Sequence, residues 1–334
     1  MGKGINSINM MLTIRSFPRL HFSLIDLSAS GFRMYGGIGM CIDALPIGLT
    51  YTATTKTDLS LLLDNGYLDV EILKLENRLI KTQQNLTLQS GVKLIAASGI
   101  QRHLGLGSGT RVALSCIEAL LNVNNVHADE KLIKECSGRG GASGVGLHSY
   151  FHGGLSLDIG RKRNHNEFKS SDIQDGVFSL PITVCSNNAL KWPIVLVIPK
   201  LAIPLSIERE NEFFSAITPL DDLTVNEAAY TALFGIFGSA ASEDYKTFCV
   251  AINHMQSLAW KKAETTIHGE EFVSQVRDIY EKFGAAAIVS SLGPTIACFS
   301  TDHEKLIKQL EFALPDSNLI TAYPRNEGRE ILYA

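Results

Sequence analysis

A glycine-rich stretch in the first third of the chain constrains the fold more than any other feature. Gly105-Leu106-Gly107-Ser108-Gly109-Thr110 separates an apolar run, 92–100, from a run with helical spacing, 112–121. A strand, a glycine loop and a helix in this order direct backbone N–H groups and the positive helix end towards one anion. We therefore expect phosphate binding by Gly105, Gly107, Ser108, Gly109 and Thr110. The alternative is a tight strand-to-helix connection that binds nothing.

A second glycine-rich segment, 137–146, opens another helix-like run, 145–151. Arg139 stands inside it, where a planar guanidinium can hold a phosphate or diphosphate through two hydrogen bonds. Two such loops predict either two anion sites or one extended site for a diphosphorylated ligand. The predicted phosphate-binding residues of this segment are Arg139, Gly140, Gly141, Ser143 and Gly144. For Arg139 the alternative is a solvated surface position.

Candidate catalytic side chains lie on an early strand. Alternation places Arg19, His21 and Ser23 on one face of it, with Asp26 at its end. If this face lines the cleft, Arg19 supplies a cation, His21 a possible general base or donor, and Asp26 a carboxylate that can hold Mg²⁺. Asp158 is a second candidate carboxylate for the same roles. The alternative in each case is a polar residue that faces solvent.

Other motifs carry less weight. His148 and His152 have the i,i+4 spacing of two ligands on one helix face, but no carboxylate motif accompanies them. His103 precedes the first glycine loop and could contact phosphate or end the strand. The chain contains no G-x-x-x-x-G-K-[ST] sequence and no Gly-x-Ser-x-Gly elbow with a following acid and histidine. P-loop enzymes and α/β-hydrolases are therefore excluded.

Composition indicates a globular protein with small-molecule ligands. A chain of 334 residues exceeds the usual size of a single core, and 45% hydrophobic with 19% charged residues is typical of globular domains. The net charge of −4 offers no basic footprint for nucleic acid. Six scattered cysteines without C-x-x-C suit a reducing compartment, and no stretch reaches membrane-spanning length. We expect a cytoplasmic protein with neither nucleic-acid nor membrane partners.

The order of the patterns predicts an α+β protein of two domains. Strand-like segments alternate with helix-like ones along both halves. A composition break between about 175 and 210 marks the boundary, which we place at 190/191.

Three segments together resemble the GHMP superfamily of small-molecule kinases. The 105–110 stretch resembles its phosphate loop, 19–26 lies where its first motif is expected, and 290–295, Ser-Ser-Leu-Gly-Pro-Thr, resembles its C-terminal glycine motif. The resemblance implies an N-terminal domain like domain 2 of ribosomal protein S5 over 1–190 and a ferredoxin-like domain over 191–334. It also adds Ser291 and Gly293 to the expected phosphate-binding residues.

The second loop departs from the kinases. Where mevalonate-kinase-like members carry a catalytic aspartate in Ser-Gly-Ile-Asp, this chain has Ser143-Gly144-Val145-Gly146. Together with 19–27 and Gly36-Gly37-Ile38-Gly39, the segment 138–146 resembles the β-ribofuranosylaminobenzene 5'-phosphate synthases.

That resemblance implies a glycosyltransferase of tetrahydromethanopterin biosynthesis. Such an enzyme joins 5-phosphoribosyl 1-diphosphate to 4-aminobenzoate or 4-hydroxybenzoate with loss of diphosphate and CO₂. Mg²⁺ is the implied cofactor, and a homodimer is compatible with the resemblance. Two alternatives remain open: an ATP-dependent GHMP kinase in which another residue replaces the aspartate, and a non-catalytic relative that binds a phosphorylated ligand.

Overall fold

The computed structural model describes residues 11–163, 168–169, 179–200 and 207–334, and it confirms the α+β class. Three antiparallel sheets carry the fold. One consists of β1 (Met11–Ser16), β4 (Ile47–Thr54), β5 (Gly91–Ser98) and β13 (Glu330–Tyr333). The second consists of β2 (Arg19–Asp26), β3 (Arg33–Cys41), β6 (Leu155–Asp158), β7 (Arg161–Lys162) and β8 (Thr183–Asn187). The third consists of β9 (Ile194–Pro199), β10 (Ala286–Val289), β11 (Ile296–Phe299) and β12 (Ser317–Ala322).

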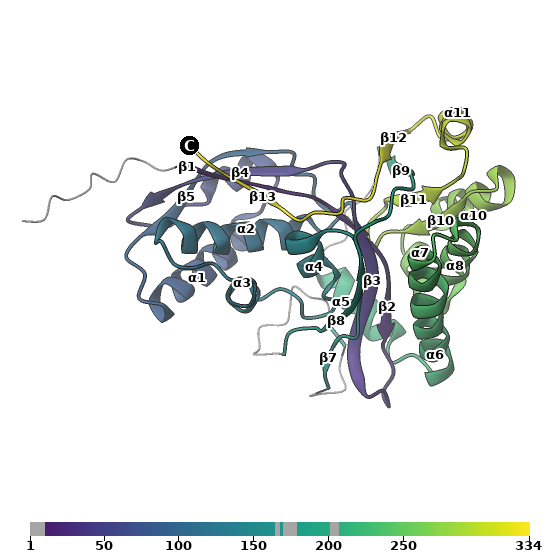
Figure 1. The fold of residues 1–334 in the computed structure, drawn as a ribbon, viewed down its shortest axis with the longest axis horizontal. Coiled ribbons are helices and arrows are strands. Elements are labelled where there is room, and N and C mark those ends of the chain that lie inside the picture. The colour runs from purple at the N-terminus through teal and green to yellow at the C-terminus, as the bar shows by residue number, and fades with distance from the viewer. Residues whose placement is uncertain (1–10, 164–167, 170–178, 201–206) are drawn as a thin grey trace, which may run out of the picture.

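Helices cover these sheets on two sides of the molecule (Figure 1). Those of the first half are η1 (Ser60–Asn65), α1 (Asp69–Asn85), α2 (Ser108–Val123), α3 (Glu130–Ser137) and α4 (Val145–His152). Those of the second half are α5 (Ile207–Ile217), α6 (Asp222–Tyr230), the π-helical η2 (Thr231–Phe237), α7 (Gly238–Ala241), α8 (Tyr245–Ser257), α9 (Ala259–Thr266), α10 (Glu270–Phe283) and α11 (His303–Ala313). The long strands β2 and β3 run between the two groups.

Helix α2 is the buried axis of the N-terminal half. All of its residues from Arg111 to Leu121 are buried, because the helix lies between the β1–β4–β5 sheet and helices α1, α3 and α4. Its apolar side chains join those of β1, β4 and β5 in one hydrophobic cluster. A helix held on every side fixes the position of its N-terminus, and that is where the first glycine loop ends.

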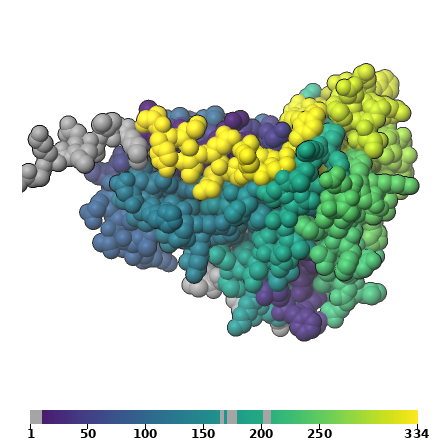
Figure 2. Space-filling model, in the orientation of Figure 1, coloured from purple at the N-terminus to yellow at the C-terminus, as the bar shows by residue number. Residues whose placement is uncertain are grey.

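The last strand crosses back over the predicted domain boundary. β13 pairs with β1, with Leu12 opposite Tyr333, and the backbone of Ala334 is bonded to that of Met11 at 2.9 and 3.0 Å. Figure 2 shows this C-terminal segment, in yellow, lying along the N-terminal half. The division at 190/191 falls between β8 and β9 and stays a prediction, but residues 330–333 pack with the first half.

Three elements differ in their limits from what the sequence pattern alone predicts. The pattern predicts a strand from Met40 that follows Gly36, Gly37 and Gly39, whereas β3 begins at Arg33 and includes these glycines, because small residues let neighbouring strands and α4 approach closely. The pattern predicts one helix over 225–237, and the structure has α6 continued by the π-helical η2. The pattern also predicts a strand over 177–184, which lies partly outside the described residues, and β8 begins at Thr183. Among described residues, no helix is long and apolar enough to cross a membrane.

Candidate active site

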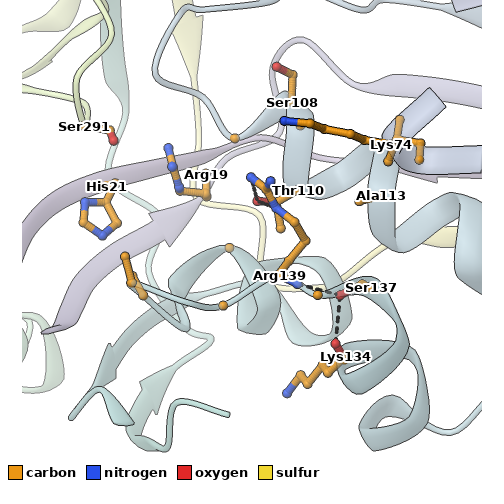
Figure 3. Close-up of a pocket in the computed structure, with 18 of the residues that line it drawn as sticks. Arg19, His21, Lys74, Ser108, Thr110, Ala113, Lys134, Ser137, Arg139 and Ser291 are labelled. Carbon is orange, nitrogen blue, oxygen red and sulfur yellow. Dashed lines mark hydrogen bonds between the residues drawn. The ribbon is translucent and has the colours of Figure 1, made fainter. Parts of the chain in front are cut away.

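Both glycine-rich loops open onto one cavity of about 1220 Å³. It lies between the N-terminal helices, strand β2 and the loop after β10, and Figure 3 shows side chains from each of these converging on it. Eight Lys and Arg side chains and four Glu side chains line it. A cavity with this excess of positive charge is suited to a ligand with several phosphate groups.

The first loop has the geometry expected of a phosphate loop. Gly107, with φ +76°, is the N-cap of α2, and Gly105 has φ +75°. A side chain on Gly105 would lie 2.0 Å from the carbonyl oxygen of Ser290, so only glycine fits there. All five predicted residues of this loop line the cavity, namely Gly105, Gly107, Ser108, Gly109 and Thr110.

Arg19 holds the first loop from the side of β2. Its guanidinium donates to the carbonyl oxygen of Gly105, and its backbone N–H donates to that of Leu106 at 3.3 Å. Burial lowers the pKa of Arg19 to about 10, so the side chain keeps its charge at neutral pH. A buried, charged guanidinium therefore lies beside the loop that we expect to bind phosphate oxygens.

Arg139 connects the second loop to the first. Its Nε and Nη2 donate to Oγ1 of Thr110 at 3.3 and 3.2 Å, and its backbone N–H donates to Oγ of Ser137 at 3.1 Å. Figure 3 shows the guanidinium of Arg139 beside Thr110, and Arg139 is close enough to Arg19 to help lower the pKa of Arg19. Of the two arrangements that the sequence allowed, the structure has one extended cavity rather than two separate ones.

Asp158 lies behind the second loop and not in the cavity. Its carboxylate accepts hydrogen bonds from the N–H groups of Gly144 and Gly160, both at 2.9 Å, and from the hydroxyl of Ser143 at 3.0 Å. Burial raises its pKa to about 6. The expectation that Asp158 contacts substrate or metal is therefore corrected: it shapes the loop. The N–H of Gly144 is bonded to Asp158 and does not point to the cavity. Of the residues predicted in this loop, Gly140 and Ser143 line the cavity, whereas Gly141 and Gly144 do not.

A β-bulge changes which residues of β2 face the cavity. The pairing of β2 with β3 shifts register between His21 and Ser23, so side-chain alternation is interrupted. Arg19 and His21 line the cavity as predicted, but Leu24 takes the place expected for Ser23. The hydroxyl of Ser23 is buried and donates to the carbonyl oxygen of Leu24 at 2.6 Å.

Asp26, predicted as a metal ligand, does not line the cavity either. Its Oδ1 accepts hydrogen bonds from the backbone N–H and hydroxyl of Ser28, at 3.3 and 3.0 Å, and lies 3.7 Å from the guanidinium of Arg163. These contacts order the turn between β2 and β3. The described residues contain no group of three or more His, Cys, Asp or Glu side chains placed to hold a metal ion.

The C-terminal glycine motif reaches into the same site. Ser290 accepts a hydrogen bond from the N–H of His21 at 3.0 Å, and the N–H of Ser291 donates to the carbonyl oxygen of His21 at 3.0 Å. A side chain on Gly293 would lie 2.0 Å from the backbone nitrogen of Gly105, so the two loops touch backbone to backbone. Ser291 and Gly293 line the cavity, as the resemblance implied.

Sequence reasoning missed a basic face of α1. Lys74, Arg78 and Lys81 follow one another at intervals of four and three residues, which places them on one side of the helix, and all three line the cavity. The spacing was visible in the sequence. Nothing in it distinguishes a cation that faces a cavity from one that faces solvent.

The histidines outside β2 have other roles. His103 lines the cavity, whereas the ring of His152 is bonded to Glu130 at 2.7 Å. The rings of His148 and His152 lie 4.9 Å apart, and burial lowers the pKa of His148 to about 4.

Comparisons with known proteins agree on both fold and relatives. No protein-family model matches the chain. It is 28% identical over 286 residues to a β-ribofuranosylphenol 5'-phosphate synthase of Archaeoglobus fulgidus, covering 86% of this chain and 87% of that protein. It is 25% identical over 303 residues to a protein of the same name from Methanocaldococcus jannaschii, covering 86% and 89%.

Solved structures show the fold. A homoserine kinase from Cytophaga hutchinsonii superimposes with a TM-score of 0.64 at 14% identity, over 99% of this chain and all of that one. A mevalonate diphosphate decarboxylase from Staphylococcus aureus superimposes with a TM-score of 0.63 at 10% identity, over 97% and 98%. The chain therefore has the fold of these kinases and decarboxylases, and it is similar over most of its length to β-ribofuranosylphenol 5'-phosphate synthases.

Proposed function

We propose that the chain is a phosphoribosyltransferase of tetrahydromethanopterin biosynthesis. It joins 5-phosphoribosyl 1-diphosphate to 4-hydroxybenzoate or 4-aminobenzoate, forming a carbon–carbon bond and releasing diphosphate and CO₂. The names of the curated relatives support this reaction class. The observation that carries it in the structure is the Arg139–Thr110 contact, which joins two glycine loops into one basic cavity large enough for a substrate with phosphates at both ends.

The reaction makes electrostatic demands that this cavity can meet. The bond between ribose C1' and the diphosphate oxygen breaks with its electron pair on diphosphate, which leaves oxocarbenium-like charge on the sugar. The ring carbon that bears the carboxylate then bonds to C1', and the electrons of its bond to the carboxylate restore aromaticity as CO₂ departs. Cations and N–H dipoles fixed before the reaction stabilise the departing diphosphate at little cost in reorganisation.

Each group of cavity residues has its own binding role in this proposal. The N–H groups of the first loop and the helix end behind them bind one phosphate group. Arg139 and Arg19, which both line the cavity, bind oxygens of the diphosphate. Lys74, Arg78 and Lys81 extend the positive field along α1 and attract the polyanionic substrate.

The described residues do not fit a resident metal site, because Asp26 and Asp158 make their hydrogen bonds away from the cavity. We propose that Mg²⁺ arrives with the diphosphate, since this ion is commonly held by substrate phosphates. The partners that we propose are small molecules. A cytoplasmic location is consistent with six free cysteines.

One specific observation favours a second candidate. Homoserine kinases share the fold, and the phosphate loop is complete, so an ATP-dependent kinase of a small alcohol stays open. Against it, Gly146 stands where a carboxylate is expected and lies beside Thr110, within the cavity.

Product analysis tests the proposal. The full chain is incubated with phosphoribosyl diphosphate, Mg²⁺ and either benzoate, and the products are identified by mass spectrometry and NMR. We expect a ribosyl phosphate bonded to ring carbon and free of carboxylate. Unchanged substrates, or a ribosyl group bonded to oxygen or nitrogen, would contradict the reaction.

A further inference from the structure

The cavity has a second end whose chemistry differs from that of the phosphate loops. Beyond Arg19, its wall is formed by apolar side chains, which we call the aromatic pocket: Leu24, Phe214, Trp260 and Leu292. His21, Glu210, Glu264 and Ser291 are among the polar residues that line the same cavity. Phosphate groups gain nothing from such a surface, whereas a flat apolar ring gains the free energy of burial against it.

The aromatic pocket is rigid. The rings of Phe214 and Trp260 lie 5.1 Å apart, and both pack in a buried cluster with Phe213 and Tyr35. The indole N–H of Trp260 donates to Oε1 of Glu264 at 2.9 Å. Packing on one side and a hydrogen bond on the other hold Trp260 in place, so the wall exists before a ligand arrives.

Lys261 completes the support of this wall. It is fully buried, and its ammonium donates to Glu264 and to the carbonyl oxygen of Val289, the latter at 2.6 Å. The positive charge is thereby neutralised within the protein. The side chain of Arg19, by contrast, lines the cavity.

His21 lies near Arg19 and Lys261, and its ring nitrogens make no hydrogen bond to the residues that the structure describes. Its side chain is 4% exposed. A buried polar group without a hydrogen bond is unfavourable, and a ligand bound here would supply the missing hydrogen bonds. Burial, followed by the nearby charges of Arg19 and Lys261, holds the pKa of His21 well below its usual value, so the ring is neutral and offers one donor and one acceptor.

We propose that the aromatic pocket binds the ring of a para-substituted benzoate, with the para O–H or N–H hydrogen-bonded to His21 and the carboxylate turned towards Arg19. This assignment rests on the proposed function, which requires the carboxylate-bearing carbon to face the ribose at the phosphate end. A hydrogen-bond acceptor on His21 also favours the carbon–carbon bond. Positive charge spreads to the para O–H or N–H as the carboxylate-bearing ring carbon bonds to ribose C1', and the acceptor stabilises that charge.

The two tryptophans of the chain allow a binding test without turnover. Trp192 packs against Tyr245 and Phe248, outside the cavity, so Trp192→Phe leaves Trp260 as the single reporter. The full chain is titrated with 4-hydroxybenzoate, 4-aminobenzoate and unsubstituted benzoate, with and without inorganic diphosphate, while tryptophan fluorescence is followed. We expect a saturable change with both para-substituted acids and about tenfold weaker binding of benzoate. The matched Trp260→Phe protein, which retains Trp192, should give no signal.

The role of His21 is tested by His21→Phe, which keeps the ring shape and removes both nitrogens. The tenfold preference should shrink to about twofold or less, and His21→Gln should retain part of it. No saturable signal, equal affinity for benzoate and 4-hydroxybenzoate in the protein with His21, or a full preference in His21→Phe would overturn the proposal. If His21→Phe does not fold, the affinities of the protein with His21 for the three acids still test the proposal.

The two proposals fail separately. CO₂ release together with equal affinity for the three acids would contradict benzoate binding by His21 and the aromatic pocket, but would still support the proposed reaction. Binding with the para preference but without CO₂ release would refute the reaction and leave the pocket standing.

Discussion

The hydroxyl of Ser290 donates a hydrogen bond to the carbonyl oxygen of Gly105 at 2.8 Å, across 185 positions of sequence. The same hydroxyl oxygen accepts from the N–H of His21 at 3.0 Å. One buried side chain from the C-terminal half therefore ties the phosphate loop to the strand that carries Arg19 and His21. The geometry of the candidate site depends on contact between the two halves.

Replacing Ser290 with alanine removes that tie. We expect Ser290→Ala to lower the free energy of unfolding by about 1–3 kcal/mol, because the buried N–H of His21 loses its partner and the carbonyl oxygen of Gly105 keeps only its bond from Arg19. Denaturant unfolding measures the change. Ser291→Ala is the matched control, since Ser291 contacts β2 through its backbone N–H. Equal stability of the two variants would contradict the role given to Ser290.

Arg139 should matter for one substrate more than the other. We expect Arg139→Ala to reduce kcat/KM for phosphoribosyl diphosphate by an amount equivalent to roughly 2–4 kcal/mol, because a clamp on a charged group is lost. Fluorescence titration should show little change in the affinity for 4-hydroxybenzoate. Arg139→Lys keeps the charge but not the two-point geometry, so its kcat/KM should lie between those of the parent protein and Arg139→Ala. A variant with unchanged kinetics would remove Arg139 from the site.

Gly146 provides a test of the missing kinase carboxylate. A side chain at this position would approach Thr110 at 3.4 Å, so both Gly146→Ala and Gly146→Asp should fold. We expect Gly146→Asp to weaken the use of phosphoribosyl diphosphate by about tenfold or more, because it places a negative charge among bound phosphates. Gly146→Ala controls for bulk and should be nearly neutral. ATP-dependent phosphorylation of a small alcohol by the parent protein, retained in Gly146→Ala, would instead support the kinase alternative.

Asp158 should make stability depend on pH. Its folded pKa of about 6 lies above its unfolded value of 3.8, so the folded state takes up a proton between the two values. Its contribution to stability is greatest below about pH 4, falls as pH rises to about 6, and then stays constant. The change is on the order of 3 kcal/mol for a group this buried.

Comparison with Asp158→Asn isolates that contribution. The difference in unfolding free energy between the parent protein and Asp158→Asn, measured by denaturant between pH 4 and pH 8, should decline across the acid range. A difference that is constant with pH would show that Asp158 keeps an ordinary pKa in the folded state.

The parts of the site that were predictable depend on local sequence. The two glycine loops, the helices that follow them and the direction of Arg19 and His21 are encoded by residues close together in the chain. Backbone freedom at glycine and the alternation of a strand are local properties, and reasoning from them was reliable.

The parts that were missed depend on tertiary contacts. Because of the bulge after His21, Leu24 and not Ser23 lines the cavity. No residue type in the strand predicts this bulge. Asp158 was recognised as special but for the wrong contact, because its partners Gly144 and Gly160 are known only from the folded loop. Trp260 and Glu264 lie on α9, a helix that the sequence patterns did not single out.

The most direct test of the central claim is release of labelled CO₂ from carboxyl-labelled 4-hydroxybenzoate and, in parallel, 4-aminobenzoate, with phosphoribosyl diphosphate and Mg²⁺. Decarboxylation and ribosyl transfer are coupled in the proposed reaction. We therefore predict CO₂ and diphosphate in equal amounts, and none of either when phosphoribosyl diphosphate is left out. No release from either acid, together with consumption of ATP on a small alcohol, would contradict the synthase and establish the kinase in its place.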